Sequence, residues 1–328
     1  MGAMHSIHSR STMNWGRTLT WNTYSGNRDL SLDVVKALLI VLVVLGHSAR
    51  AGACSNVMNG IVSFIYHFHM PLFVIICGYF FKFDYPSVMA RKICLRYWLP
   101  YFSGGLLFVA GLWAFKGVAV GKSLVNLMAG YRLGAMWFLY TIAAIETILC
   151  ISHAISERNR ELGLLFAIGM FVAAIALPVR VESWSVFYFL CGMLLKGSLL
   201  DCRLGSAYGL LAAVIYCAID LPWYTELSVV SMIFVACIGI LLRWCSEWLL
   251  RFRVGGVLAR LGRWSIVILI FHPLFNLVLS RAAPLFASVD GTGVAFWLVE
   301  TIAGIAGSMF AGKLLVCLKL STLFGLRI

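Results

Sequence analysis

The sequence predicts an all-α integral membrane protein, built as a bundle of about ten transmembrane helices with both termini in the cytoplasm. Of the 328 residues, 62% are hydrophobic and only 12% are charged. A soluble domain is nearer half apolar and a quarter charged, so the composition excludes a soluble fold. The apolar residues also gather in runs of about 20, the length that crosses a bilayer as a helix.

Ten apolar runs are candidate spans. They cover residues 32–51, 59–81, 98–115, 136–155, 162–178, 184–199, 204–221, 227–243, 264–281 and 294–316. The polar first 30 residues hold no apolar stretch typical of a cleavable signal peptide. We therefore expect a cytoplasmic tail over residues 1–30, one transmembrane domain over residues 31–320 and a second cytoplasmic tail over residues 321–328.

The orientation follows from the distribution of Lys and Arg. With a cytoplasmic N-terminus, the inside segments carry 19 of these residues and the outside loops carry six, and Lys36 within the first run completes the 26. This asymmetry supports ten spans with both ends in the cytoplasm, and the membrane that we expect the protein to occupy is a bacterial inner membrane. The net charge of +13 does not indicate nucleic-acid binding, because the basic residues lie in short loops between spans rather than on one face.

Three ionisable residues, Asp33, Lys36 and His47, interrupt the first apolar run. Eleven positions on a helix are about 20° past three full turns and about 16 Å along the axis, so Lys36 and His47 share one face. Asp33 lies three residues before Lys36 and can pair with it. Ionisable groups inside a membrane favour a functional interpretation. The alternative is that Lys36 only extends to the interface and that His47 caps the far end.

The second run carries His67 and His69, which would point about 200° apart on a regular helix. They could serve one site only if the backbone is irregular there, and Pro71 can create such an irregularity. Because the first two runs are joined by a short loop, His47 and one of these two histidines lie at similar depth. Such a pair could act as a general base and its partner. Gly78 offers a place for close helix approach.

Among the ionisable residues of the later runs, three stand out: Glu146 in the fourth, His272 in the ninth and Glu300 in the tenth. Each is buried by position and needs a partner, either in a site or in a structural network. No metal site is expected, because the histidines lack the grouped spacing of membrane di-iron enzymes and no CxxC motif occurs. Most of the ten cysteines lie inside apolar runs, where they act as small hydrophobic residues.

Several stretches together resemble the acyltransferase-3 superfamily. Its first-helix motif is a basic residue, ten further residues and a histidine, which here runs from Lys36 to His47 with lysine in place of the usual arginine. The stretch "YHFHMPLFVIICGYFF" is similar to the second-helix signature of the fucose 4-O-acetylase-like branch, with His69 as the matching histidine. Further similarities are "RKICLRYWLPY" (91–101), "MWFLYTIAAIE" (136–146) and "LARLGRWSIVILIFHPLF" (258–275).

The resemblance implies a membrane O-acyltransferase, usually an O-acetyltransferase, with acetyl-CoA as co-substrate. The acyl group would pass from the cytoplasm to a sugar hydroxyl on an extracytoplasmic polysaccharide such as exopolysaccharide or O-antigen, on a glycolipid or on a lipid-linked saccharide. The donor phosphates need basic groups at the cytoplasmic face, and the candidates are Lys36, Arg91, Lys92 and Arg96.

The thioester end of the donor would lie deeper, near His47 as general base. The candidate catalytic residues are His47, His69, Asp33, Glu146 and His272, and the candidate substrate-binding residues are Trp137, Tyr140 and His67. His69, Trp137, Tyr140 or a backbone N–H could stabilise the oxyanion. A multi-span transporter or flippase is the alternative class, since intramembrane charges and proline-broken helices also suit a carrier. A non-catalytic partner in polysaccharide export is a third.

Overall fold

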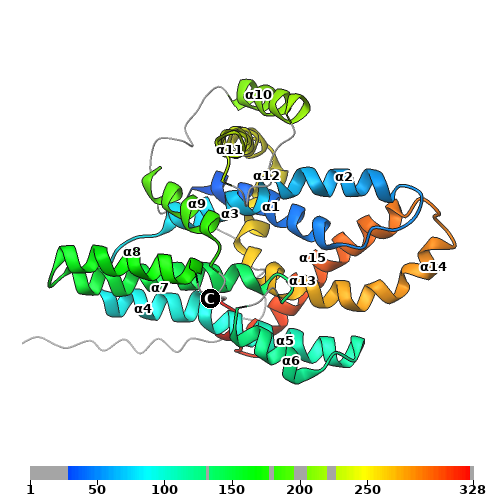
Figure 1. The fold of residues 1–328 in the computed structure, drawn as a ribbon. Coiled ribbons are helices and arrows are strands. Elements are labelled where there is room, and N and C mark those ends of the chain that lie inside the picture. The colour runs from blue at the N-terminus through cyan, green and yellow to red at the C-terminus, as the bar shows by residue number, and fades with distance from the viewer. Residues whose placement is uncertain (1–28, 131–132, 177–180, 196–204, 220–226, 326–328) are drawn as a thin grey trace, which may run out of the picture.

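The computed structural model describes residues 29–130, 133–176, 181–195, 205–219 and 227–325, and within these ranges the chain forms helices and no strand, which confirms the predicted all-α class (Figure 1). The α-helices are α1 (Leu30–His47), α2 (Ser55–Tyr66), α3 (His69–Phe80), α4 (Pro86–Ile93), α5 (Leu99–Lys116), α6 (Val120–Met128), α7 (Met136–Ser156), α8 (Arg160–Ala176), α9 (Ser183–Leu194), α10 (Gly205–Ala218), α11 (Val229–Leu249), α12 (Arg253–Arg263), α13 (Ser265–Leu279), α14 (Ala283–Ala287) and α15 (Val294–Cys317). A π-helical turn (Cys94–Trp98) joins α4 to α5, and short 3₁₀ turns occupy Ser280–Ala282 and Ser321–Phe324.

Seven helical segments in the described residues are long and apolar enough to cross a membrane, so the protein is a multi-pass membrane protein. They are Leu30–His47, Ser55–Phe80, Pro86–Lys116, Met136–Ser156, Val229–Leu249, Ser265–Ala287 and Val294–Cys317. The other three predicted spans coincide with α8, α9 and α10. As described, α9 and α10 are about 18 and 21 Å long, shorter than the hydrocarbon core of about 30 Å. The number ten and the cytoplasmic location of both ends stay predictions.

Three helices, α1, α13 and α15, pack against one another, and α12 lies along α1 (Figure 1). The other close pairs are α3 with α9, α7 with α8 and α10 with α11. The N-terminus of α1, the loop between α3 and α4 and the helix α12 gather at one end of the bundle, which we call the basic end because Lys82, Lys92, Arg260 and Arg263 lie there.

The helices α3 and α9 meet backbone to backbone, as predicted for Gly78. A Cβ at Gly78 would lie 2.0 Å from the carbonyl oxygen of Phe189, and one at Gly192 would lie 2.1 Å from the carbonyl oxygen of Ile75. Neither position has room for a side chain, and this close approach fixes α3 against α9.

Asp29 caps the N-terminus of α1. Its carboxylate accepts hydrogen bonds from the backbone N–H of Ser31 (3.0 Å) and from the Ser31 hydroxyl, and it forms an ion pair with Arg243 of α11 (2.5 Å). Burial by itself would raise the pKa of Asp29, but the hydrogen bonds from Ser31 and Arg243 outweigh it and hold this pKa below its usual value. The cap therefore orders the first turn of α1 and ties it to α11.

The segment after α15 packs back onto the bundle. Phe324 is buried against Phe271 of α13, with ring centroids 5.2 Å apart, and the carbonyl of Leu323 accepts a hydrogen bond from Ser103 of α5. Residues 321–325, which the sequence assigned to a tail, thus contribute to the wall of the bundle.

Candidate active site

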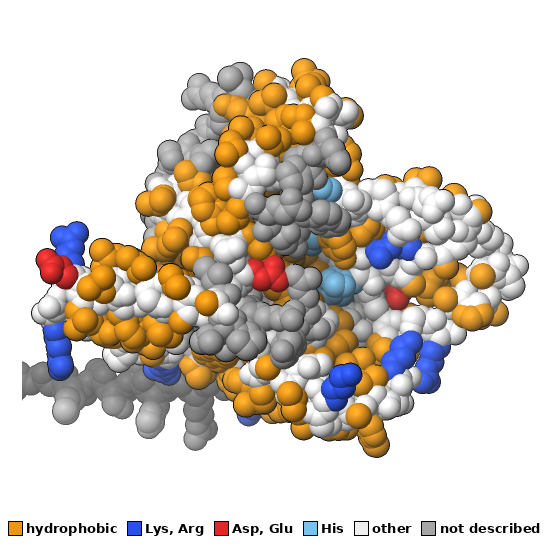
Figure 2. Space-filling view, viewed as in Figure 1, with side chains coloured by type: hydrophobic (Ala, Val, Ile, Leu, Met, Phe, Trp, Pro, Cys, Tyr) orange, Lys and Arg blue, Asp and Glu red, His pale blue; other side chains and the backbone are white. Residues whose placement is uncertain are grey.

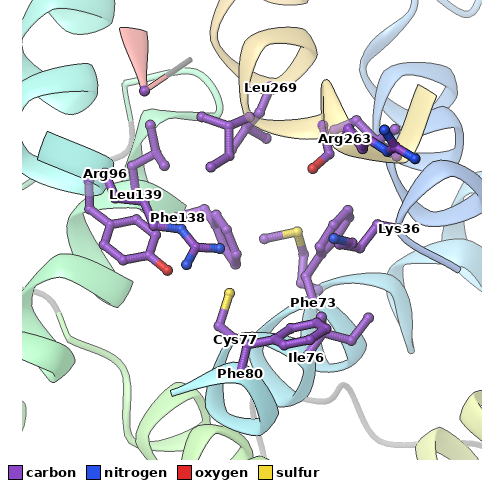
Figure 3. Close-up of a pocket in the computed structure, with 17 residues that line it drawn as sticks. Lys36, Phe73, Ile76, Cys77, Phe80, Arg96, Phe138, Leu139, Arg263 and Leu269 are labelled. Carbon is purple, nitrogen blue, oxygen red and sulfur yellow. The ribbon is translucent and has the colours of Figure 1, made fainter. Parts of the chain in front are cut away.

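A cavity of about 440 Å³ lies at the basic end, between α1, α3, α7, α13 and the π-helical turn. Its polar lining residues are Lys36, Cys77, Arg96, Tyr97, Arg263 and Ser265. Figure 3 shows the side chains of Lys36 and Arg96 facing the same space from opposite walls, above the sulfur of Cys77. A cavity of this size can hold part of an elongated ligand that carries negative charge.

The predicted pair between Asp33 and Lys36 is confirmed, with the ammonium 2.6 Å from the carboxylate. The side chain of Asp33 is 2% exposed and that of Lys36 is 18% exposed. Arg263 of α12, a residue that sequence reasoning did not select, lies 3.8 Å from the second oxygen of Asp33. Asp33 therefore holds two cations at the edge of the cavity, and the ammonium of Lys36 also lies 5.4 Å from the ring centroid of Phe80.

The π-helical turn places two consecutive residues, Arg96 and Tyr97, in the lining of one cavity. On a regular helix neighbouring residues point about 100° apart, and the extra residue of a π turn, a feature frequent at functional sites, changes that spacing. Both residues also line a second, adjoining cavity of about 230 Å³ together with Glu146 of α7. The hydroxyl of Tyr97 donates a hydrogen bond to Glu146, whose carboxylate interacts electrostatically with Arg96.

The other two predicted donor-binding residues lie further out. Arg91 and Lys92 are exposed on α4 and both face an open hollow beside Ser87, and Lys92 also lines the smaller cavity. Lys92 forms an ion pair with Asp84 (2.6 Å), and the hydrogen bond from Lys92 lowers the pKa of the Asp84 carboxyl. These residues supply positive charge around the basic end rather than contacts inside the larger cavity.

Three histidines from three helices meet further along the bundle. The rings of His47 and His272 have centroids 5.3 Å apart, and His47 interacts electrostatically with both His69 and His272. His69 and His272 are buried, whereas His47 is exposed. Figure 2 shows histidine side chains in a hollow near the middle of the face that it draws. The prediction that His47 and one of the second-run histidines lie at similar depth is confirmed for His69.

Backbone hydrogen bonds orient the two buried rings. Nδ1 of His69 lies 2.8 Å from the carbonyl oxygen of Ile65, and Nδ1 of His272 lies 2.7 Å from that of Ile268. A carbonyl can only accept, so each Nδ1 carries the proton and each Nε2 is left as an acceptor. The backbone irregularity that the sequence suggested is present. The helix is interrupted at His67 and Phe68, between α2 and α3, just before His69.

The C-terminal end of α1 is held by several side chains, which fixes the backbone of His47. The indole N–H of Trp297 donates to the carbonyl of Leu45 (3.0 Å), and the hydroxyl of Tyr66 donates to that of Gly46 (3.0 Å). Glu300 accepts a hydrogen bond from the backbone N–H of Ala49 (2.6 Å). Helix ends leave carbonyl groups without partners, and here neighbouring helices supply donors, so the position of His47 is determined by tertiary contacts.

The larger cavity and the histidines lie on the same three helices. The lining residues farthest from the basic end are Ile40 on α1, Met70 on α3 and Leu269 on α13. On a helix, His47 follows Ile40 by about 10 Å, His272 follows Leu269 by about 4.5 Å, and His69 is the neighbour of Met70. A ligand anchored at the basic end can therefore extend toward the histidine cluster.

Besides Asp33, which lies with Lys36 at the basic end, four predicted catalytic or substrate-binding residues lie away from this cluster. Glu146 is with Arg96 at the basic end, and Tyr140 packs in an aromatic group with Trp98 and Tyr101 on the other side of α7. Trp137 contacts Trp184 of α9, with centroids 6.0 Å apart, and His67 packs against Tyr216 of α10. Among the described residues, no group of three His, Cys, Asp or Glu side chains is arranged to hold a metal ion.

Comparisons with known proteins identify the family of the chain. A family model described as "Acyltransferase domain", of the acyltransferase-3 family, matches residues 29–313. Nodulation protein NolL of Sinorhizobium fredii is 29% identical over 185 residues, which is 45% of this chain and 50% of that protein. Nodulation protein NolL of Mesorhizobium japonicum is 42% identical over 59 residues, 17% of this chain and 16% of that protein.

The match to the first relative spans about half of that protein's length. No solved structure matches the chain. The family model, by contrast, covers the described bundle from the cap of α1 to the last turn of α15. The chain therefore belongs to the acyltransferase-3 family, and its membrane-spanning bundle is an acyltransferase domain.

Proposed function

We propose that the protein is an O-acetyltransferase of a bacterial inner membrane, which moves an acetyl group from cytoplasmic acetyl-CoA to a hydroxyl of an extracytoplasmic glycan or glycolipid. The observation that carries this proposal is the shared framework of the basic cavity and the histidine cluster. Acyl-CoA has phosphates at one end and a thioester at the other, and the two sites suit these two ends.

The basic end would bind the donor. Lys36, Arg96 and Arg263 supply three cations around the larger cavity, and cations beside phosphates form charge-assisted hydrogen bonds. Most of the remaining lining is apolar, with Phe73, Phe138 and Leu269 among its residues. The neutral arm of the donor can lie along these side chains, with the thioester pointing toward His47.

At the histidine cluster, His47 would act as the general base. Its ring takes the proton of the acceptor hydroxyl as the oxygen attacks the thioester carbon, and the carbonyl oxygen becomes an oxyanion. Collapse of this intermediate breaks the C–S bond and releases the CoA thiolate, which takes up a proton. Neutral imidazole is suited to this role near pH 7. The exposure of His47 beside two buried histidines supports its assignment as the residue that meets the acceptor.

The test is His47→Ala in a host whose own copy is deleted, with His153→Ala of α7 as the matched control. His153 lies in the last turn of α7, 3.9 Å from Glu157, and is not part of the histidine cluster. After membrane abundance is shown to be normal, O-acetyl groups on the extracted surface glycans are measured by NMR. We expect acetylation to be lost in His47→Ala and retained in His153→Ala. Unchanged acetylation in His47→Ala would refute the proposal, and a loss of surface glycan itself would indicate a flippase.

A further inference from the structure

Asn276 lies one helical turn after His272 on α13 and is 8% exposed. Both its amide nitrogen and its amide oxygen are buried without a hydrogen-bond partner among the described residues, and Nε2 of His272 is in the same situation. An unpaired polar group in a low-dielectric interior costs free energy. Two neighbouring groups left in this state indicate that a further molecule satisfies them in the working protein.

These groups lie where α1, α13 and α15 meet. Gly304 of α15 makes the room: a Cβ there would lie 3.1 Å from Oδ1 of Asn276, 3.2 Å from Val44 and 3.8 Å from Cβ of His272. The ring of His272 in turn lies against that of His47, with centroids 5.3 Å apart. The amide of Asn276 is thus beside the histidine cluster and not at a distant packing contact.

Other polar side chains in this junction already have partners. The hydroxyls of Ser48 and Thr301 are 3.0 Å apart, and the hydroxyl of Ser308 donates to the carbonyl of Gly304 (2.6 Å). The junction therefore satisfies its polar groups where the helices alone can do so. Asn276 and His272 differ from these side chains, because the surrounding helices leave their polar atoms without a hydrogen-bond partner.

The unpaired atoms have complementary chemistry. The neutral His272 donates through Nδ1 to a carbonyl, so its Nε2 can only accept, while the amide nitrogen of Asn276 can only donate. A group that satisfies these two atoms must donate one hydrogen bond and accept another, while the amide oxygen of Asn276, which only accepts, needs a further donor from the same ligand. A hydroxyl does this, whereas a thioester carbonyl, which only accepts, does not.

We propose that His272 and Asn276 form an acceptor subsite that holds a second hydroxyl of the sugar, next to the hydroxyl that reacts at His47. The held hydroxyl donates to Nε2 of His272 and accepts from the amide of Asn276, and it keeps its proton throughout. This inference rests on the proposed function and adds to it the substrate class, a sugar with neighbouring free hydroxyls, and a residue that positions it.

The test compares the full-length wild type with Asn276→Leu, which is similar in size but apolar, and with Asn276→Ala, which adds no bulk. Ser308→Ala is the control, because Ser308 is fully buried in the same junction and, among the described residues, its hydroxyl bonds within its own helix. Detergent-permeabilised membranes, in which both faces are accessible, receive radiolabelled acetyl-CoA and the host glycan after mild alkali has removed its esters. We expect the apparent KM for glycan to rise about tenfold or more in both Asn276 variants, with the KM for acetyl-CoA within about twofold.

Stability separates this role from a structural one. If Asn276 makes no bond within the protein, Asn276→Leu should have the same melting temperature as the wild type or a higher one. A lower melting temperature would overturn the inference. A glycan KM that does not change would also overturn it, and would mean that the amide binds only a buried water. A rise in the acetyl-CoA KM alone would also overturn it. A wild type that forms no ester would refute the proposed function instead.

Discussion

Replacing Lys36 with methionine separates two roles that the structure gives to one ammonium group. Lys36 is the ion-pair partner of Asp33, at 2.6 Å, and it also lines the larger cavity. Lys36→Met keeps an unbranched side chain, one heavy atom shorter, and removes the charged ammonium group. The double variant Asp33→Asn with Lys36→Met removes the carboxylate charge as well, so it restores the balance of charge without restoring a cation for the donor.

The expected sizes of the two effects differ. A buried carboxylate that loses its partner destabilises a protein by about 3 kcal/mol or more, and we expect the lower end because Arg263 remains 3.8 Å from Asp33. The double variant should recover stability to within about 1 kcal/mol of the wild type. The lost contact to a donor phosphate is worth about 1.5–3 kcal/mol, which raises the KM for acetyl-CoA roughly 10- to 150-fold.

The assay is acetyl transfer in detergent-permeabilised membranes at varied acetyl-CoA and at varied acceptor, combined with thermal unfolding of the purified protein in detergent. Lys36→Arg is the control, because it keeps the charge and matches the residue usual in the family's first-helix motif; its KM for acetyl-CoA should stay within about threefold of the wild type. If the double variant also recovered a wild-type KM for acetyl-CoA, Lys36 would have only a structural role. A larger effect on the acceptor KM would mean that the donor lies elsewhere.

Two further predictions concern how α1 is held. Gly262→Ala in α12 should lower stability by about 1–3 kcal/mol and raise the KM for acetyl-CoA, because the new Cβ would lie 1.8 Å from the backbone oxygen of Asp33. Gly256→Ala is the control: its new Cβ would meet no atom of another segment within 4 Å, so neither quantity should change. Equal melting temperatures for the two variants would contradict this prediction. The pKa of Asp29 is lowered although burial alone would raise it, because hydrogen bonds from the adjacent serine and from Arg243 outweigh burial. Its contribution to stability is therefore full above about pH 4 and is lost as the pH falls through the lowered folded-state pKa. Asp29→Asn keeps a capping side chain without the titration, so the difference in melting temperature between wild type and this variant should shrink on acidification, and a difference that grows would refute the assignment.

The positions of the apolar helices were predictable because they depend on local composition. Each of the ten apolar runs overlaps one or two helices of the described residues, since a mostly apolar stretch in a bilayer must satisfy its own backbone hydrogen bonds. The pair of Asp33 and Lys36 was also predictable, because helix geometry places residues three apart on one side. The family followed from motif order along the chain, which the matched region 29–313 confirms.

The partners between helices were not predictable from one sequence. Periodicity locates His272 on a span but does not indicate that its ring meets that of His47. It also does not indicate that Arg263 lies close to Asp33. Glu146 lies midway along its span in the sequence, and only packing places it with Arg96 and not with the histidines. The unpaired amide of Asn276 has no sequence signal, because it is recognised by what surrounds it.

Residue order alone was therefore enough to predict the many membrane crossings, the family, and a helix with Lys36 and His47 on one face. These properties depend on the order of residues within single segments. The tertiary structure decided which helices surround that face, and so which side chains share the basic cavity and which share the histidine cluster. The physical reason is that contacts between helices depend on close packing of whole surfaces, such as the backbone approach at Gly78 and Gly192, and no local pattern encodes it.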